Sequence, residues 1–178
     1  MLFLYDVSLS DIIINEVEKY LVATSYENIK ALLDEGGFRY SITSEGNLLT
    51  GFGEMEEYID SEGRPRLGVL IFLEESGNFV RFLCPRLYRY EGKRFKTDLL
   101  QSCLMINYWA KLLKFEFDDR DGEVRAVIEL PLEDTELSLS QLSRCLTTLA
   151  YLIDRLDPLI RRTLKEGGIH IPREPITF

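Results

Sequence analysis

The stretch at residues 67–73 is the part of the chain that most restricts its fold. It reads Leu-Gly-Val-Leu-Ile-Phe-Leu, without the alternation expected of a strand that has one face in water. A short apolar run of this kind is typical of a central strand that is covered on both faces. It is far shorter than the roughly 20 apolar residues that cross a bilayer. We therefore expect a sheet with helices packed on it.

The sequence around this run predicts an antiparallel meander. Over residues 38–89 the apolar residues recur with a period near two, and β-branched and aromatic residues become frequent. Turn signals rich in glycine, serine and asparagine interrupt this pattern three times. They predict strands near residues 38–43, 48–59, 66–74 and 78–84.

Three stretches show the three- and four-residue spacing of helices. The first covers residues 10–36 and is expected to form two helices, because Thr24 and Ser25 offer a second N-cap within it. The second, residues 95–113, is apolar around much of its circumference, so we expect it to be buried on more than one side. The last begins with a capping box at residues 138–141 and carries a stripe of leucine and isoleucine towards Gly167.

A second hairpin is expected between the last two helices. Residues 114–130 alternate between apolar and polar side chains around the turn at Asp121 and Gly122. Residues 169–178 contain Pro172 and Pro175 and should form an extended tail. The chain is thus predicted to be one α+β domain over residues 1–178, with an antiparallel sheet of about five strands packed against helices in the order α-β-β-β(-β)-α-β-β-α.

The composition restricts the partners. With 46% hydrophobic and 29% charged residues and a net charge of -9, the chain has the character of a globular, acidic protein. Nucleic acid is not expected as a partner, because affinity for phosphate backbones depends on clustered Lys and Arg. Cys84, Cys103 and Cys145 are odd in number and lie in apolar runs, which favours a reducing, cytoplasmic setting. No export signal or membrane span is predicted.

No motif identifies a catalytic, cofactor-binding or metal-binding residue, so we expect no enzyme and no cofactor. The acidic turn at residues 118–123 lacks the ligand pattern of a calcium loop, since Phe117 and Ile128 stand where oxygen ligands would be needed. His170 is the single histidine, which leaves no second imidazole for a metal cluster or a triad. Whether any of the many carboxylates converge in a cleft stays open.

Two candidate surfaces follow from the sequence. One is a partner or dimer surface on the helix at 95–113, and the other is a basic segment at 86–96 that could hold an anion. The alternative for the basic segment is a loop that balances acidic neighbours or meets an acidic patch of a partner. The residues of the first surface are Leu99, Cys103, Ile106, Trp109 and Leu113, and the cations of the second are Arg86, Arg89, Lys93, Arg94 and Lys96.

The second half of the chain resembles the YbjN family of bacterial proteins. The resemblance rests on an Asn-containing helix with Ile106 and Asn107, a short strand at 114–118, a turn at Gly122 and a leucine-rich helix from Leu139. The order of helices and strands is similar to that of type III secretion chaperones. This resemblance implies a non-enzymatic, often homodimeric protein that offers sheet and helix surfaces to a segment of another protein.

The leading hypothesis is therefore a protein-interaction or chaperone-like module that binds another protein and forms a homodimer. The alternative is a small-anion or ligand-binding domain, or an enzyme, that uses surface carboxylates or the basic loop at 86–96. A nucleic-acid regulator that uses the same loop is a third hypothesis, and it would require binding that weakens steeply with salt.

Overall fold

The computed structural model describes residues 23–172 except 91, 93 and 134. Most of the first of the two helices predicted over residues 10–36, and residues 173–178 of the predicted tail, lie outside this range. The helices are α2 (Tyr26–Glu35), α3 (Lys96–Trp109) and α4 (Leu139–Glu166), with a short 3-10 helix η1 (Glu75–Gly77). The strands are β1 (Ser41–Ile42), β2 (Leu48–Gly53), β3 (Arg66–Glu74), β4 (Phe79–Arg89), β5 (Lys114–Asp118) and β6 (Glu123–Pro131).

The strands form one antiparallel sheet in the order β1-β2-β3-β4-β6-β5. The predicted α+β class, the antiparallel sheet and the element order are confirmed. The sheet has six strands because the hairpin of β5 and β6 joins the meander at β4, where Leu83 pairs with Val127.

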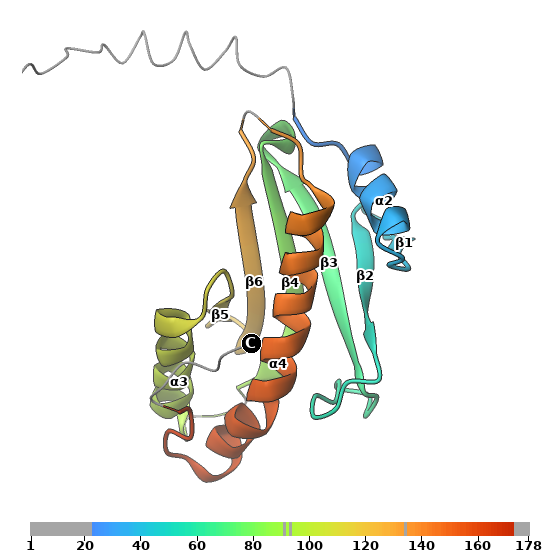
Figure 1. Ribbon diagram of the computed structural model, residues 1–178. Coiled ribbons are helices and arrows are strands. Elements are labelled where there is room, and N and C mark those ends of the chain that lie inside the picture. The colour runs from blue at the N-terminus through green and yellow to red at the C-terminus, as the bar shows by residue number, and fades with distance from the viewer. Residues whose placement is uncertain (1–22, 91, 93, 134, 173–178) are drawn as a thin grey trace, which may run out of the picture.

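All three helices in the described part of the chain pack on the same side of the sheet, with α4 lying along it and α2 and α3 on either side of α4 (Figure 1). We call this side the helix face and the opposite side the outer face. The stripe of α4 that contains Leu142, Leu146 and Leu149 is fully buried against the inward side chains of β3, β4 and β6. Burial of such side chains contributes roughly 1.5–3 kcal/mol each, so the core between α4 and the sheet holds the fold together.

Local sequence fixes the ends of α4. The Ser138 side chain accepts a hydrogen bond from the Gln141 amide, and the Gln141 side chain accepts one from the Ser138 amide, as the capping box predicts. The helix ends at Gly167, whose φ of 78° is left-handed. A side chain at this position would also collide with the Phe95 ring, so glycine allows α3 and α4 to approach each other at this end.

The strand predicted near residues 38–43 is limited to Ser41–Ile42, and two other predicted strand ends were wrong. The strand predicted at 48–59 stops at Gly53, because Glu54 takes a left-handed φ of 59° and the chain leaves the sheet to contact α4. The strand predicted at 78–84 continues to Arg89 through a bulge between Cys84 and Tyr88, in which Arg86 has a φ of 51°. Both irregularities depend on contacts made far along the sequence, which periodicity does not report.

The expected double cover of residues 67–73 is met on one face only among the residues that the structure describes. Leu67, Val69 and Ile71 point into the core below α4, whereas Leu70 and Phe72 lie on the outer face, where none of the described helices packs. No helix in the described ranges has an apolar stretch long enough to cross a bilayer.

Candidate functional site

Helix α3 has a buried face that belongs to the core. Leu99 and Ile106 are completely buried and Cys103 is 6% exposed, while Leu113, which follows the helix just before β5, is 1% exposed. They pack within the chain, so these four predicted partner residues are not available at the surface of a single copy. Trp109, the fifth, is half-buried at the edge of this face.

The opposite face of α3 is apolar and exposed. Leu104 is 68% exposed and Tyr108 is 92% exposed, and Leu112 just beyond the helix is 41% exposed. With Gln101, Met105 and Trp109, the first two side chains line a shallow hollow of about 400 Å³. The residues predicted for a partner surface lie mostly on the inner side, because a helix that is apolar all round does not show which side faces water.

Asn107 connects α3 to the edge of the sheet. Its amide nitrogen donates to the Phe115 carbonyl oxygen at 3.0 Å, and its amide oxygen accepts from the Phe115 N–H at 2.7 Å. Because β5 is the last strand of the sheet, these bonds occupy backbone groups that would otherwise face outward. Asn107 thus closes part of this edge to pairing with another strand.

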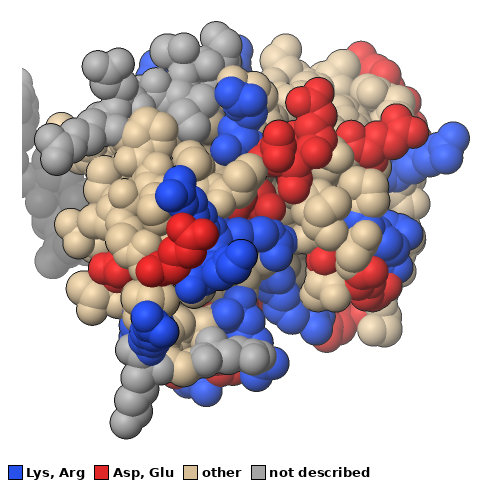
Figure 2. All heavy atoms as spheres, turned by 90° about the horizontal axis from the view of Figure 1, so that it is seen from below, with Lys and Arg blue, Asp and Glu red and all other residues tan. Residues whose placement is uncertain are grey.

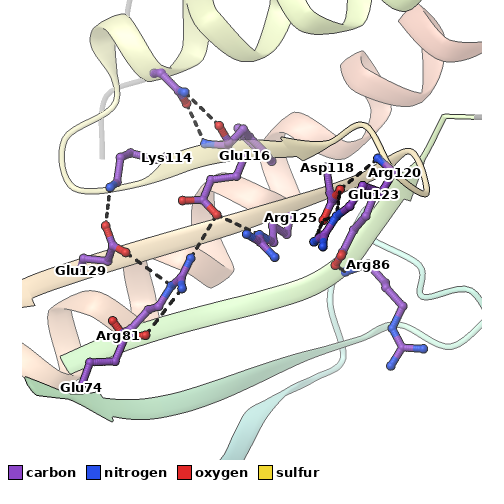
Figure 3. Close-up of polar contacts among 12 residues, drawn as sticks. Glu74, Arg81, Arg86, Lys114, Glu116, Asp118, Arg120, Glu123, Arg125 and Glu129 are labelled. Atoms are coloured by element: carbon purple, nitrogen blue, oxygen red, sulfur yellow. Dashed lines mark hydrogen bonds and ion pairs between the residues drawn. The ribbon is translucent and has the colours of Figure 1, made fainter. Parts of the chain in front are cut away.

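A network of ion pairs occupies the outer face of β4, β5 and β6 (Figure 3). Arg81 lies 3.1 Å from Glu116 and 3.4 Å from Glu129. Arg125 lies 2.8 Å from the same Glu116 oxygen, and Lys114 lies 2.5 Å from Glu129. Each of these cations therefore has an acidic partner on the same face, and Arg81 is only 21% exposed at its side chain.

The basic segment at 86–96 lies at the end of the molecule seen in Figure 2, where Lys and Arg side chains gather between acidic groups. Arg89 donates to the Asp121 carbonyl oxygen at 3.2 Å, Arg94 lies 4.5 Å from the Phe95 ring centroid, and Lys96 lies 4.8 Å from that of Phe117. The Arg86 side chain points away from the ion-pair network (Figure 3). Lys93 lies outside the described residues. Most of these cations already contact neighbouring groups of the chain. The arrangement therefore favours a basic loop whose side chains stabilise the fold, and not an anion-binding site.

A buried polar cluster joins α4 to β4 and to the loop after β2. Asp157 is 2% exposed, and one of its oxygens lies 2.7 Å from Nε of Arg161, whose guanidinium lies 5.8 Å from the Tyr88 ring centroid. Burial raises the pKa of Asp157 more than Arg161 lowers it, and burial together with Asp157 raises the pKa of Tyr58 to about 12. Nothing in the sequence pattern distinguished Asp157 from the other acidic residues of α4.

The residues that the structure describes contain no group of three or more His, Cys, Asp or Glu that could hold a metal ion. The acidic turn after β5 is a hairpin turn in which Arg120 binds Asp118 and Gly122 has a left-handed φ of 76°. Cys84, Cys103 and Cys145 are free and buried, and burial raises the pKa of the Cys103 thiol to about 12.

The antiparallel sheet with its three described helices on one face forms a small α+β fold. Its structure is similar to the crystal structure of YbjN from E. coli, a candidate transcription regulator, with a TM-score of 0.55 and 12% sequence identity. The match covers 78% of this chain and 95% of YbjN, and at this identity it shows the fold alone. No protein-family description and no curated protein sequence matches the chain.

Proposed function

We propose that the protein is a non-enzymatic, chaperone-like protein-interaction module and that its copies pair through the exposed face of α3. The observation that carries this proposal is the exposure of Leu104 and Tyr108, 68% and 92%, beside a hollow in the same helix face. Large exposed apolar side chains that are grouped in this way are typical of surfaces that meet another protein. The YbjN-like fold is compatible with such a role.

A second copy is the occupant that this surface fits best. The whole chain has a net charge of -9, so two copies repel each other, and a surface of low charge is where they can meet with the least repulsion. The charged residues of α3 are Lys96 and Asp98, and both lie in its first turn, away from Leu104 and Tyr108. A helix face that meets its own copy about a twofold axis makes each contact twice, which suits a single exposed stripe.

The setting proposed for this module is cytoplasmic. The three cysteines are buried and free in the structure, which fits a reducing compartment. We also propose that the pair binds a segment of a further protein.

The experiment is light scattering of the purified protein over a series of concentrations, with one variant and one matched control. Tyr108→Glu places a carboxylate in the proposed seam and should give the mass of a single chain, whereas the unchanged protein gives that of two. Ile42→Glu is the control, since it replaces another exposed apolar side chain, 59% exposed, at the far edge of the sheet.

The control should keep the mass of the unchanged protein, and circular dichroism should show the same helix content in all three proteins. A single-chain mass for the unchanged protein at every concentration would overturn the pairing. An equal loss of pairing in both variants would assign the effect to added charge, and not to the α3 surface.

A further inference from the structure

The outer face of the sheet carries an apolar set that does not belong to the core. Leu49, Leu70, Leu83 and Val127 are neighbours in register across β2, β3, β4 and β6, and Phe72 follows Leu70 along β3 on the same face. None of these five side chains is in the cluster of core residues below α4. They form a second apolar group, on a face where the described residues place no helix.

This group is continuous with a hollow. Gly51 pairs with Gly68 in the next step of the ladder, and the missing side chains leave a depression of about 580 Å³ that also reaches Leu49 and Arg66. The ion-pair network around Arg81 borders the apolar group on its other side. Because those charges are already paired with one another, a cover over the apolar group leaves no charge without a partner.

The segment that best fits over this apolar group is the part of the chain just before the described residues. Residues 10–22 have apolar residues at Ile13, Val17, Tyr20 and Leu21, the spacing of an amphipathic helix. The described chain starts at Ala23, and Ala23 and Thr24 lie against Gly77 in the turn between β3 and β4. The segment is therefore tethered at one end of the two strands that carry Leu70, Phe72 and Leu83.

Length supports the same occupant. A helix over residues 10–22 would be about 20 Å long at roughly 1.5 Å per residue. The distance along β3 from Glu74 to Gly68 is also about 20 Å at roughly 3.3 Å per residue. A tethered segment is present at a high effective concentration, on the order of millimolar, whereas a separate protein must be supplied from solution.

We infer that residues 10–22 pack as a helix along β3 on the outer face and cover Leu70, Phe72 and Leu83 with Ile13, Val17, Tyr20 and Leu21. This explains why residues 67–73 are apolar on both faces of the strand: one face meets α4 and the other meets the N-terminal segment. The inference concerns the face opposite α3 and does not depend on the proposed pairing.

The test measures the reactivity of one introduced thiol in the full-length chain. Leu70→Cys places a thiol in the outer apolar group, and the rate of its reaction with Ellman's reagent reports whether that group is covered. The three native thiols give little background, because Cys84, Cys103 and Cys145 are at most 6% exposed.

Val17→Glu is then added to place a carboxylate on the apolar side of the predicted helix, and Asn15→Glu is the matched control on its polar side. The combination with Val17→Glu should raise the reaction rate by about tenfold or more, since burying an unpaired carboxylate disfavours the covered state. The combination with Asn15→Glu should leave the rate within about twofold of Leu70→Cys alone, as expected for a surface substitution.

A rate for Leu70→Cys equal to that of Ile42→Cys, at a position 59% exposed and away from the α3 surface, would show that the face is open and would overturn the inference. If the Leu70→Cys thiol reacts at equal rates in the combinations with Val17→Glu and with Asn15→Glu, residues 10–22 are not the segment that covers the face. Protection that appears only as the protein concentration rises would show that a second copy, and not the chain's own segment, covers the face.

Discussion

At the scale of single residues, Asn107 makes a prediction that can be tested directly. Both of its hydrogen bonds go to Phe115 in the edge strand β5. Asn107→Asp keeps the shape but removes the N–H donor and brings a carboxylate oxygen near the Phe115 carbonyl. The free energy of unfolding should fall by about 1–3 kcal/mol, the cost of a buried group left without its partner.

Urea unfolding at neutral pH measures this change, with Thr97→Glu, at an exposed position in the first turn of α3, as the control. The control adds the same charge to the same helix and should stay within about 0.5 kcal/mol of the unchanged protein. Equal stability of Asn107→Asp and the unchanged protein would mean that the two bonds contribute nothing to the fold. The sequence marks Asn107 only through the family resemblance, because no spacing rule shows that a helix residue binds a strand beside it.

Asp157 provides a second residue-scale prediction, in pH dependence. Burial raises its pKa above the ordinary value of 3.8, so the folded protein holds the proton more tightly than the unfolded chain does. Between the ordinary and the raised pKa the folded state binds more protons, and this residue's contribution to stability therefore falls as pH rises through that window. In Asp157→Asn the side chain does not titrate, so this contribution to the pH dependence is absent.

The measurement is urea unfolding of Asp157→Asn and of the unchanged protein from about pH 3.8 to neutral pH. This range lies above the ordinary pKa because burial raises the pKa of Asp157. The stability of the unchanged protein relative to the variant should decrease over this range. Asp34→Asn, at an exposed site near the end of α2, serves as control. Parallel curves for Asp157→Asn and the unchanged protein would contradict the raised pKa.

At the scale of elements, the loop after β2 depends on α4 for its position. The Asp154 carboxylate accepts hydrogen bonds from the amides of Glu56, Glu57 and Tyr58 at 3.3, 2.9 and 2.8 Å. Asp154→Ala should speed hydrogen exchange at these three amides and lower stability by about 1–3 kcal/mol, as for other bonds to charged groups. Arg155→Ala, a substitution at the neighbouring position, is the control and should leave exchange at these amides unchanged. If the three amides stay protected in Asp154→Ala, Asp154 does not hold the loop in place.

Local signals in the sequence predicted some of these elements but not the start of this loop. The strand at 66–74 and the start of α4 were predicted at the residues where they occur, because a long apolar run and a capping box are local signals. The end of β2 and the bulge in β4 were missed. Their causes are Asp154, almost a hundred residues after the loop it binds, and Glu123, which accepts from the Arg86 amide at 2.7 Å. Contacts of this range have no counterpart in a local pattern.

At the scale of the whole molecule, the predicted surfaces also depend on contacts between distant residues. Composition and net charge indicate a globular, acidic protein, because both are sums over the chain. The side of α3 that faces water is decided by the position of α4 and β5, which bury Leu99 and Ile106 and leave Leu104 and Tyr108 outside. The sequence alone therefore located the candidate surface to one helix but not to one face.

The net charge of -9 on each chain makes the salt dependence of pairing diagnostic. If two copies meet through the apolar face of α3, the charges elsewhere only repel, and this repulsion is screened as the Debye length falls from about 30 Å at 0.01 M salt to about 8 Å at 0.15 M. The fraction of paired chains should therefore rise with salt at a fixed protein concentration. Sedimentation equilibrium at the two salt concentrations measures it, and Tyr108→Glu should remain single at both. If pairing weakens with salt, ion pairs hold the copies together, and the basic end of the molecule becomes the surface through which they meet.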